Sequence, residues 1–165
     1  MVLQEILVRR YLVSDHTAVL HLHVLALEAL GAYLGKGFHD EDLADIEATY
    51  LAAGGEFLVV IYHDQLIAMC GLRPLPDDSG EIKRMRVHPE FQGQGIGHLL
   101  LTQLEDRACA LGYTRLCLDT SSRQPIAQHV YQRHGYCETH RAPIRDFEII
   151  FMAKELARDL DATSR

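Results

Sequence analysis

Three alternate glycines stand in the stretch FQGQGIGHLL, residues 91–100, immediately before an apolar pattern typical of a helix. At the start of a helix, free backbone N–H groups and the helix dipole form an anion site that needs no basic side chain. Glycine lets a phosphate group approach such a backbone closely. The stretch therefore predicts a phosphate site where a strand turns into a helix, and the alternative is a loop that uses glycine only to turn.

The familiar nucleotide-binding loops do not match this stretch. The dinucleotide pattern GxGxxG needs a glycine where His98 stands, and no GxxxxGK[ST] occurs in the chain. The sequence also lacks the features of a kinase ATP site. A phosphate-bearing ligand held by this loop would therefore belong to another class.

Two blocks of the chain resemble the GNAT superfamily of acyl-CoA-dependent N-acyltransferases. The stretch MRVHPEFQGQGIGHLLL, which starts at Met85, is similar to the family's Arg/Gln-x-x-Gly-x-Gly/Ala pyrophosphate signature and to its Val-x-Pro lead-in. Downstream, AQHVYQRHGYCE resembles the family's Ala-x-x-x-Tyr-x-x-x-Gly-Phe helix, with Tyr136 in place of the phenylalanine. The spacing of the two blocks also fits, so the resemblance covers about residues 5–155.

The resemblance implies a coenzyme A site along one strand end, the glycine loop and the later helix. Backbone groups of residues 85–87 would run beside the pantetheine arm, and residues 93–98 would hold the pyrophosphate. An asparagine that contacts coenzyme A in the family is Gln124 here, which is one methylene longer. The expected cofactor-binding residues are Met85, Arg86, Val87, Gln92, Gly93, Gln94, Gly95, Ile96, Gly97, His98, Gln124, Ala127 and Tyr131.

Acetyl transfer to an amine asks for three groups. The amine has to lose its proton, the tetrahedral oxyanion needs a hydrogen-bond donor, and the thiolate leaves more easily when it is protonated. The resemblance implies that Tyr131 protonates the thiolate, and the backbone N–H of Val87 would serve the oxyanion. Neither a metal nor a covalent intermediate is required. The alternative for Tyr131 is a half-buried aromatic side chain that only packs its helix.

Two carboxylates compete as the general base. Asp119 lies near the carboxyl end of its predicted strand, where ligands of open α/β sheets collect, and it shares a face with Cys117. Glu81 opens the neighbouring strand, on the side from which an acceptor would approach. A carboxylate at its reference pKa, about 4, is a weak base for an ammonium of about 10, so a base here would act through water or after desolvation. The spacing to Tyr131 favours Asp119, and the alternative for both is a solvated or ion-paired surface carboxylate.

The sequence predicts an acetyl-CoA-dependent N-acetyltransferase of a small amine, amino acid or peptide amino group. One alternative is a catalytically silent CoA-binding sensor or structural module with the same fold, but Tyr131 and the nearby carboxylates favour the enzyme. A further alternative is nucleotide or phosphate binding unrelated to coenzyme A. In the family the first two helices line the acceptor site, so acceptor specificity is expected in residues 20–50.

The elements that must position these residues can be read from hydrophobic periodicity and turn signals. Strands are predicted near residues 5–11, 56–63, 66–73, 81–88, 114–120 and 147–156, with another short strand at 136–141. Helices are predicted from Ser14 or Asp15 to Leu34, over 39–55, from the glycines to Gly112, and over 125–135. The connections include a hairpin turn at Asp64–Gln65 and a loop over 74–80.

The predicted fold class is therefore α/β of the mixed, α+β-like kind. A mostly antiparallel sheet of six to seven strands carries helices on both faces, and a right-handed crossover makes 81–88 and 114–120 a parallel pair. In the first strand of this pair, apolar Ile82 is followed by apolar Met85 and Val87, so the alternation changes phase. One extra residue near Lys83–Arg84 would repair it, which predicts a β-bulge that splays the pair and opens room for pantetheine.

Length and composition bound the remaining alternatives. The chain of 165 residues fits one domain, 1–165, and a flexible tail is expected from about residue 157. A net charge of −7 argues against nucleic acid as the main partner. The four cysteines form no CxxC pair, which favours free thiols in a reducing compartment and hence a cytoplasmic location.

Membrane and metal partners are not expected. The chain starts without a signal-peptide pattern, and His21, His23 and Glu28 interrupt the apolar stretch 18–35 below the length of a membrane span. The ten histidines show no metal-ligand spacing, so no metal is expected. The expected partners are a CoA thioester and an amine acceptor, without nucleic acid or membrane, and a homodimer is left open.

Overall fold

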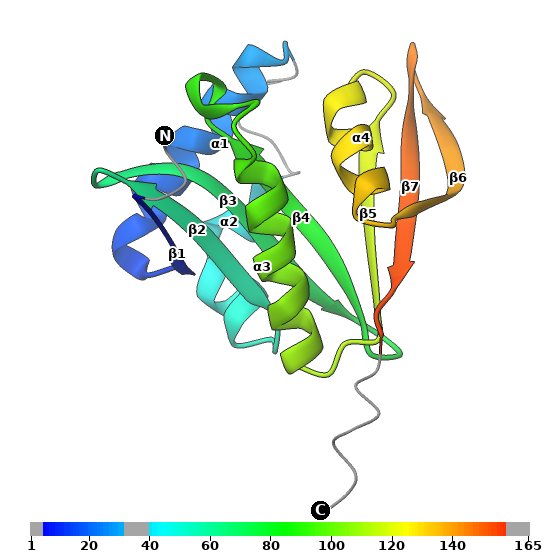
Figure 1. Ribbon diagram of the computed structural model, residues 1–165, viewed down its shortest axis with the longest axis horizontal. Helices are drawn as coiled ribbons and strands as arrows, with labels where there is room; N and C mark the ends of the chain where they lie inside the picture. Colours follow the sequence, from blue (N-terminus) through cyan, green and yellow to red (C-terminus); the bar gives the residue numbers. More distant parts are fainter. Residues whose placement is uncertain (1–4, 32–39, 158–165) are drawn as a thin grey trace, which may run out of the picture.

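The computed structural model describes residues 5–31 and 40–157. Seven strands form one sheet in the order β1-β2-β3-β4-β5-β7-β6. Within the described residues β4 and β5 are the only parallel neighbours. Figure 1 shows these two strands meeting at one end of the molecule and diverging toward the other. The mixed fold class and the parallel pair are therefore confirmed.

The order of elements also agrees with the prediction, including the short strand at 136–141. The strands are β1 (Ile6–Arg10), β2 (Glu56–Tyr62), β3 (Gln65–Leu75), β4 (Ser79–Val87), β5 (Arg115–Ser121), β6 (Cys137–Ile144) and β7 (Phe147–Glu155). The α-helices are α1 (His16–Ala29), α2 (Glu41–Ala44), α3 (Ile96–Ala110) and α4 (Pro125–Arg133). Short helical turns are η2 (Val13–Asp15), η4 (Glu47–Leu51) and η5 (Pro89–Phe91).

Two predictions fall partly outside the described residues. The first helix starts after Asp15, as predicted, but α1 ends at Ala29, and the predicted end at Leu34 is not among the described residues. Most of the predicted tail, 158–165, is not among them either. None of the helices in the described part of the chain is long and apolar enough to cross a membrane.

The predicted second helix, 39–55, is wrong as one continuous element. It is split into α2 and the π-helical turn η4, because Asp45 adopts an extended conformation with φ −142° and ψ 84°. The Asp45 carboxylate then accepts a hydrogen bond of 2.9 Å from the backbone N–H of Ala48. An aspartate that bonds the backbone nearby competes with the helix ladder and restarts the helix instead of continuing it.

The predicted turn and the predicted loop in the first half of the sheet both differ from the structure. The β2–β3 turn is centred on His63 and Asp64, one residue before the predicted pair, and both residues have positive φ, 45° and 63°. Most of the predicted loop 74–80 belongs to β3 and β4, which a short turn joins at Asp77 and Asp78, again with positive φ. His and Asp are among the residues that enter this region most readily, so the hairpins close without glycine.

The predicted bulge in β4 is confirmed. Lys83 lies opposite Gly71 and Arg86 lies opposite Met69, so two residues of β4 face one residue of β3. The inserted Arg84 has φ 58°. Pairing between β4 and β5 covers only residues 79–81 of β4, and the two strands are unpaired beyond that point. The bulge therefore bends β4 away from β5 where the acetyl donor is expected.

Two apolar layers cover the two faces of the sheet. On one face, α3 and α4 pack against the strands in a cluster that includes Leu100, Leu104, Leu116 and Tyr131. On the other face, α1, α2 and η4 form a second cluster around Tyr50, Phe57 and Met69. Figure 1 shows α3 lying across β2–β4 and α4 beside β5, which places both helix N-termini at the splayed end of the sheet.

Candidate functional site

A cavity of about 680 Å³ lies where β4 and β5 diverge. Its walls come from the end of β4, the glycine loop, the start of α3, the end of β5, α4 and part of α1. The wall includes nearly every residue predicted to bind the cofactor: Met85, Arg86, Val87, Gln92, Gly93, Gly95, Ile96, Gly97, His98, Gln124, Ala127 and Tyr131. Gln94 is the exception, since its exposed side chain donates to the Glu90 carbonyl at 3.2 Å.

The glycine loop presents backbone to this cavity. Gly93 and Gly95 both have positive φ, 73° and 83°, a conformation that side-chain-bearing residues rarely adopt. Gly95 is the N-cap of α3, and the first turn of that helix carries no acidic residue. Gly97 lies inside the first turn, and an added Cβ there would meet only the Val87 side chain, at 3.9 Å. The start of α3 therefore offers uncovered N–H groups to an anion.

His98 adds little charge to this anion site. Its Nδ1 lies 3.0 Å from Nε2 of His134, and the two rings are stacked. Burial, and then the neighbouring His134, lower the pKa of His98. A neutral imidazole is therefore expected at pH 7, and the backbone supplies the attraction for phosphate.

Tyr131 is a buried residue that lines the cavity. Its side chain is 6% exposed and packs edge-on against Tyr136, with ring centroids 5.9 Å apart. Burial raises the pKa of the Tyr131 hydroxyl, and the charge of Arg86 opposes this only in part. The phenol is consequently protonated across the neutral range, which is the state that a proton donor needs.

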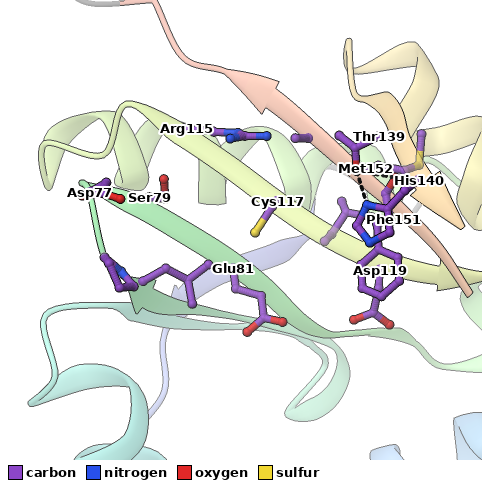
Figure 2. A pocket seen from close by; sticks show the side chains of 14 residues that line it. Asp77, Ser79, Glu81, Arg115, Cys117, Asp119, Thr139, His140, Phe151 and Met152 are labelled. Atoms are coloured by element: carbon purple, nitrogen blue, oxygen red, sulfur yellow. Dashed lines mark hydrogen bonds between the residues drawn. The ribbon is translucent and has the colours of Figure 1, made fainter. Parts of the chain in front are cut away.

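The structure separates the two candidate bases. Asp119 lines the main cavity together with Tyr131, whereas Glu81 does not. Glu81 instead borders a second cavity of about 450 Å³, where Asp119 and Cys117 also lie. Figure 2 shows the carboxylates of Glu81 and Asp119 on the same side of β4 and β5.

Glu81 is also engaged elsewhere. It accepts a hydrogen bond of 2.5 Å from Nη2 of Arg73 and lies 3.6 Å from Nζ of Lys83. Asp119 is exposed at the cavity wall. Of the two carboxylates, Asp119 is thus the one that shares a space with Tyr131.

The backbone of Val87 faces the opening between β4 and β5. The N–H of His88 donates to the Ile67 carbonyl at 2.8 Å, so it points toward β3. Successive N–H groups of a strand point to opposite edges, which directs the N–H of Val87 away from β3 and toward the cavity. The carbonyl of Val87 accepts a hydrogen bond of 3.1 Å from Gln92.

The end of β5 and the start of α4 form the far wall. Gln124 is the N-cap residue of α4, and its Oε1 accepts a hydrogen bond of 3.1 Å from the buried Thr120 hydroxyl. This bond fixes the amide at the cavity wall and leaves its NH₂ group to donate. Gln124 therefore presents to the cavity an amide whose oxygen is held by a neighbouring side chain, and its contact with coenzyme A stays a prediction.

The bulge residue Arg84 anchors α2 to the sheet beside the cavity. Its Nε donates to Asp42 at 2.9 Å and its Nη1 to Asp40 at 3.0 Å, and the Tyr50 hydroxyl also donates to Asp42. Asp40 further pairs with the buried His23 of α1 at 3.1 Å. No local sequence pattern indicates this cluster, because Arg84 lies some forty positions from Asp40 and Asp42 in the chain.

We expect Arg84→Met to lower the free energy of unfolding by about 3 kcal/mol at neutral pH, since it leaves the partly buried carboxylates of Asp40 and Asp42 without their cation. Burial alone would raise the pKa of Asp42, but the hydrogen bonds from Arg84 and Tyr50 outweigh burial and hold this pKa below its ordinary value. A lowered folded-state pKa stabilises the protein above about pH 4 and loses that effect as pH falls further. In urea unfolding experiments, the difference in the free energy of unfolding between the variant and the wild type should therefore become smaller below that pH.

A matched control is Arg141→Met, which removes two exposed ion pairs, one with Glu138 of β6 and one with Glu148 of β7. It should change stability little at any pH, because exposed pairs contribute little. An Arg84→Met protein as stable as this control would show that the cluster does not hold α2.

The described residues contain no group of three or more His, Cys, Asp or Glu side chains placed to hold a metal ion. All four cysteines are free thiols, and Cys70 is buried. Only the backbone of Arg86 was predicted to bind the cofactor, yet the structure also gives its guanidinium a place beside the cavity, where the Nε atom is buried without a hydrogen-bond partner. Alternation would have revealed this, since the apolar neighbours Met85 and Val87 must face the core on the opposite side.

Comparison with known proteins identifies the family. Residues 20–136 match the model of the acetyltransferase (GNAT) family. The chain is 30% identical over 117 residues to the "IAA acetyltransferase" of Azospirillum brasilense, an alignment that covers 70% of this chain and 76% of that protein. The chain spans less than half the length of three other curated relatives, at 38%, 47% and 46%.

Solved structures share the fold. An acetyltransferase of the GNAT family from Staphylococcus aureus Mu50 superposes with a TM-score of 0.83 at 23% identity, over 92% of this chain and 99% of that chain. The Salmonella typhimurium protein yncA, solved with its cofactor acetyl-CoA, gives 0.77 at 20% identity, over 94% and 99%. With the family model matched from α1 to the start of β6 and the splayed β4–β5 pair in place, the chain belongs to the GNAT family of acetyltransferases.

Proposed function

We propose that this protein transfers the acetyl group of acetyl-CoA to a primary amine by direct attack. The observation that carries the proposal is one cavity that contains an anion site, a protonated tyrosine and a carboxylate. The anion site is the start of α3, the tyrosine is Tyr131 and the carboxylate is Asp119. The structural relative yncA was solved with acetyl-CoA, which supports the same donor here.

The chemistry of the cavity wall supports a CoA thioester as the donor. The glycine loop leaves open backbone at the start of α3 for the pyrophosphate, and nothing lies within 4 Å of a Cβ added at Gly93. The pantetheine arm would lie along the end of β4 that does not pair with β5. The backbone groups of β4 on that edge would hydrogen-bond to the arm as they would to a neighbouring strand. The thioester then lies between Val87 and Tyr131.

In the proposed reaction, the amine nitrogen attacks the thioester carbonyl carbon and forms the new C–N bond. The N–H of Val87 donates to the oxyanion, and Asp119 accepts the amine proton directly or through water. The C–S bond then breaks, and its electron pair leaves with sulfur. Tyr131 protonates the thiolate and recovers its own proton from solvent.

A thiol-release assay with acetyl-CoA and a panel of amines tests this function. Release that depends on the amine, with the acetylated amine identified by mass spectrometry, is the expected result. A protein that binds coenzyme A but acetylates no amine of the panel would instead be a silent CoA-binding module. Binding of ATP without binding of coenzyme A would contradict both.

The general base can be tested by its pH dependence. We expect Asp119→Asn to lower kcat/KM about a hundredfold and to remove the acidic limb of the pH profile, because the carboxylate accepts the amine proton. Glu81→Gln should keep that limb, since Glu81 is paired with Arg73 and lies outside the main cavity. If only Glu81→Gln lost the acidic limb of the pH profile, Glu81 would be the general base. If both variants kept the limb, the acceptor would arrive already neutral.

A further inference from the structure

Arg86 is a cation in the cavity wall that forms no close ion pair with a carboxylate of the described residues. Its Nη1 donates to the neighbouring Met85 carbonyl at 2.8 Å, which fixes the guanidinium in place. Its Nε is buried and has no hydrogen-bond partner. Among the described ion pairs none includes Arg86, whereas the other cations of this wall have acidic partners: Lys83 with Glu81, Arg84 with Asp40 and Asp42, and Arg123 with Asp146.

The side chain of Arg86 faces away from the glycine loop. Its neighbours Met85 and Val87 pack against the apolar layer under α3, so alternation turns Arg86 to the face covered by α1. The buried His23 of α1 feels its charge: after burial, Arg86 is the main cause that lowers the pKa of His23. Ala26 of α1 lines the cavity on this side. Arg86 therefore faces the half of the cavity opposite the site expected for pyrophosphate.

A partly buried cation without a close ion-pair partner is unfavourable in the free protein, and it is stabilised when an anion enters the cavity. Burial, and then the charge of Arg84, lower the pKa of Arg86, and the carboxylates of Asp40 and Asp119 oppose this only in part. Arginine binds carboxylates well, because its planar N–H groups match the two oxygens. The same cavity contains Asp119, which would accept the amine proton, so the wall offers one group for an amine and one for an acid.

We infer that the acceptor is an amine that also bears a carboxylate, of the amino acid class, and that Arg86 binds this carboxylate. The inference rests on the proposed acetyl transfer and adds the substrate class to it. Arg86 would hold the acid at the α1 side of the cavity while the amino group reaches the thioester beside Val87. It would act as a specificity-determining residue and take no part in proton transfer.

The test compares each of a set of amino acids with its amide and with the amine that lacks the carboxyl group, for example L-phenylalanine, L-phenylalaninamide and phenethylamine. We expect the best acid to exceed its two partners in kcat/KM by about a hundredfold, as for one lost member of a buried charge pair. The amide is the weaker base and thus more often a neutral nucleophile, so basicity cannot produce this preference. In Arg86→Gln the preference should disappear, while the affinity for coenzyme A stays.

Arg141→Gln is the matched control, since it removes an exposed arginine outside both cavities. It should keep the preference for acids. Equal turnover of acids, amides and decarboxylated amines by wild type would overturn the inference and leave the proposed function intact. An Arg86→Gln protein that loses affinity for coenzyme A but still prefers acids would also overturn it, and would assign Arg86 to the donor. If no acceptor of the set caused thiol release, and calorimetry detected no binding of the acids, both proposals would be rejected.

Discussion

Gly97→Glu is expected to abolish measurable binding of coenzyme A. The residue lies in the first turn of α3 and lines the cavity, and an added Cβ would meet only Val87, at 3.9 Å, so a side chain fits there. A glutamate at this position brings negative charge to the start of the helix, where the pyrophosphate is proposed to bind. Such like-charge contacts cost several kcal/mol, which corresponds to at least about a hundredfold in affinity. Calorimetric titration of the variant and the wild type with coenzyme A measures this loss of affinity.

Two companion variants separate charge from bulk and backbone strain. Gly97→Ala adds the Cβ alone and should bind coenzyme A nearly as well as wild type. Gly95→Glu should also abolish binding, but Gly95 has φ 83°, so this variant combines charge with strain, and Gly95→Ala carries the strain alone. His98→Ala should bind with near wild-type affinity, because the backbone supplies the attraction. Unchanged affinity in folded Gly97→Glu would place the pyrophosphate elsewhere.

The sheet could be predicted from the sequence because its signals are local. The phase change from Ile82 to Met85 and Val87 indicated the bulge, and the structure has two residues of β4 facing one of β3 there. Helix 39–55 could not be predicted correctly, since its apolar spacing continues through Asp45 while the aspartate side chain breaks the helix. The hairpin turns were misplaced because Asp and His take the positive φ for which glycine is the usual signal.

Some parts of the candidate site could likewise be predicted from the sequence, and others could not. The resemblance and the strand alternation were enough to predict the glycine loop, Tyr131 and Asp119 as neighbours, and all three line one cavity. The side chain of Arg86 was not considered, although its apolar neighbours already indicated its face. The pairing of Arg84 with Asp40 and Asp42 had no local signal, since only the folded bulge brings them together. Long-range charge pairing depends on the tertiary structure that sequence spacing does not describe.

Tyr131→Phe is expected to lower kcat by about tenfold to a hundredfold and to leave the affinity for coenzyme A unchanged. The substitution removes one hydroxyl and keeps the ring that packs edge-on against Tyr136. Because burial raises the pKa of Tyr131, the wild-type phenol holds its proton throughout the neutral range and can give it to the departing thiolate. A proton donor used only as the thiolate leaves contributes to the transition state and not to binding, so kcat and kcat/KM should fall together.

Tyr136→Phe is the matched control for this prediction. Tyr136 is also a buried tyrosine, 2% exposed, in contact with the same ring, but it does not line the cavity. If the two hydroxyls mattered only for packing, both variants would change stability and turnover alike. A proton donor instead predicts that turnover falls in Tyr131→Phe alone, most strongly with acetyl-CoA and least with an activated thioester whose thiolate leaves without help. Equal turnover in both variants would return Tyr131 to a packing role, and thiolate release would then depend on solvent.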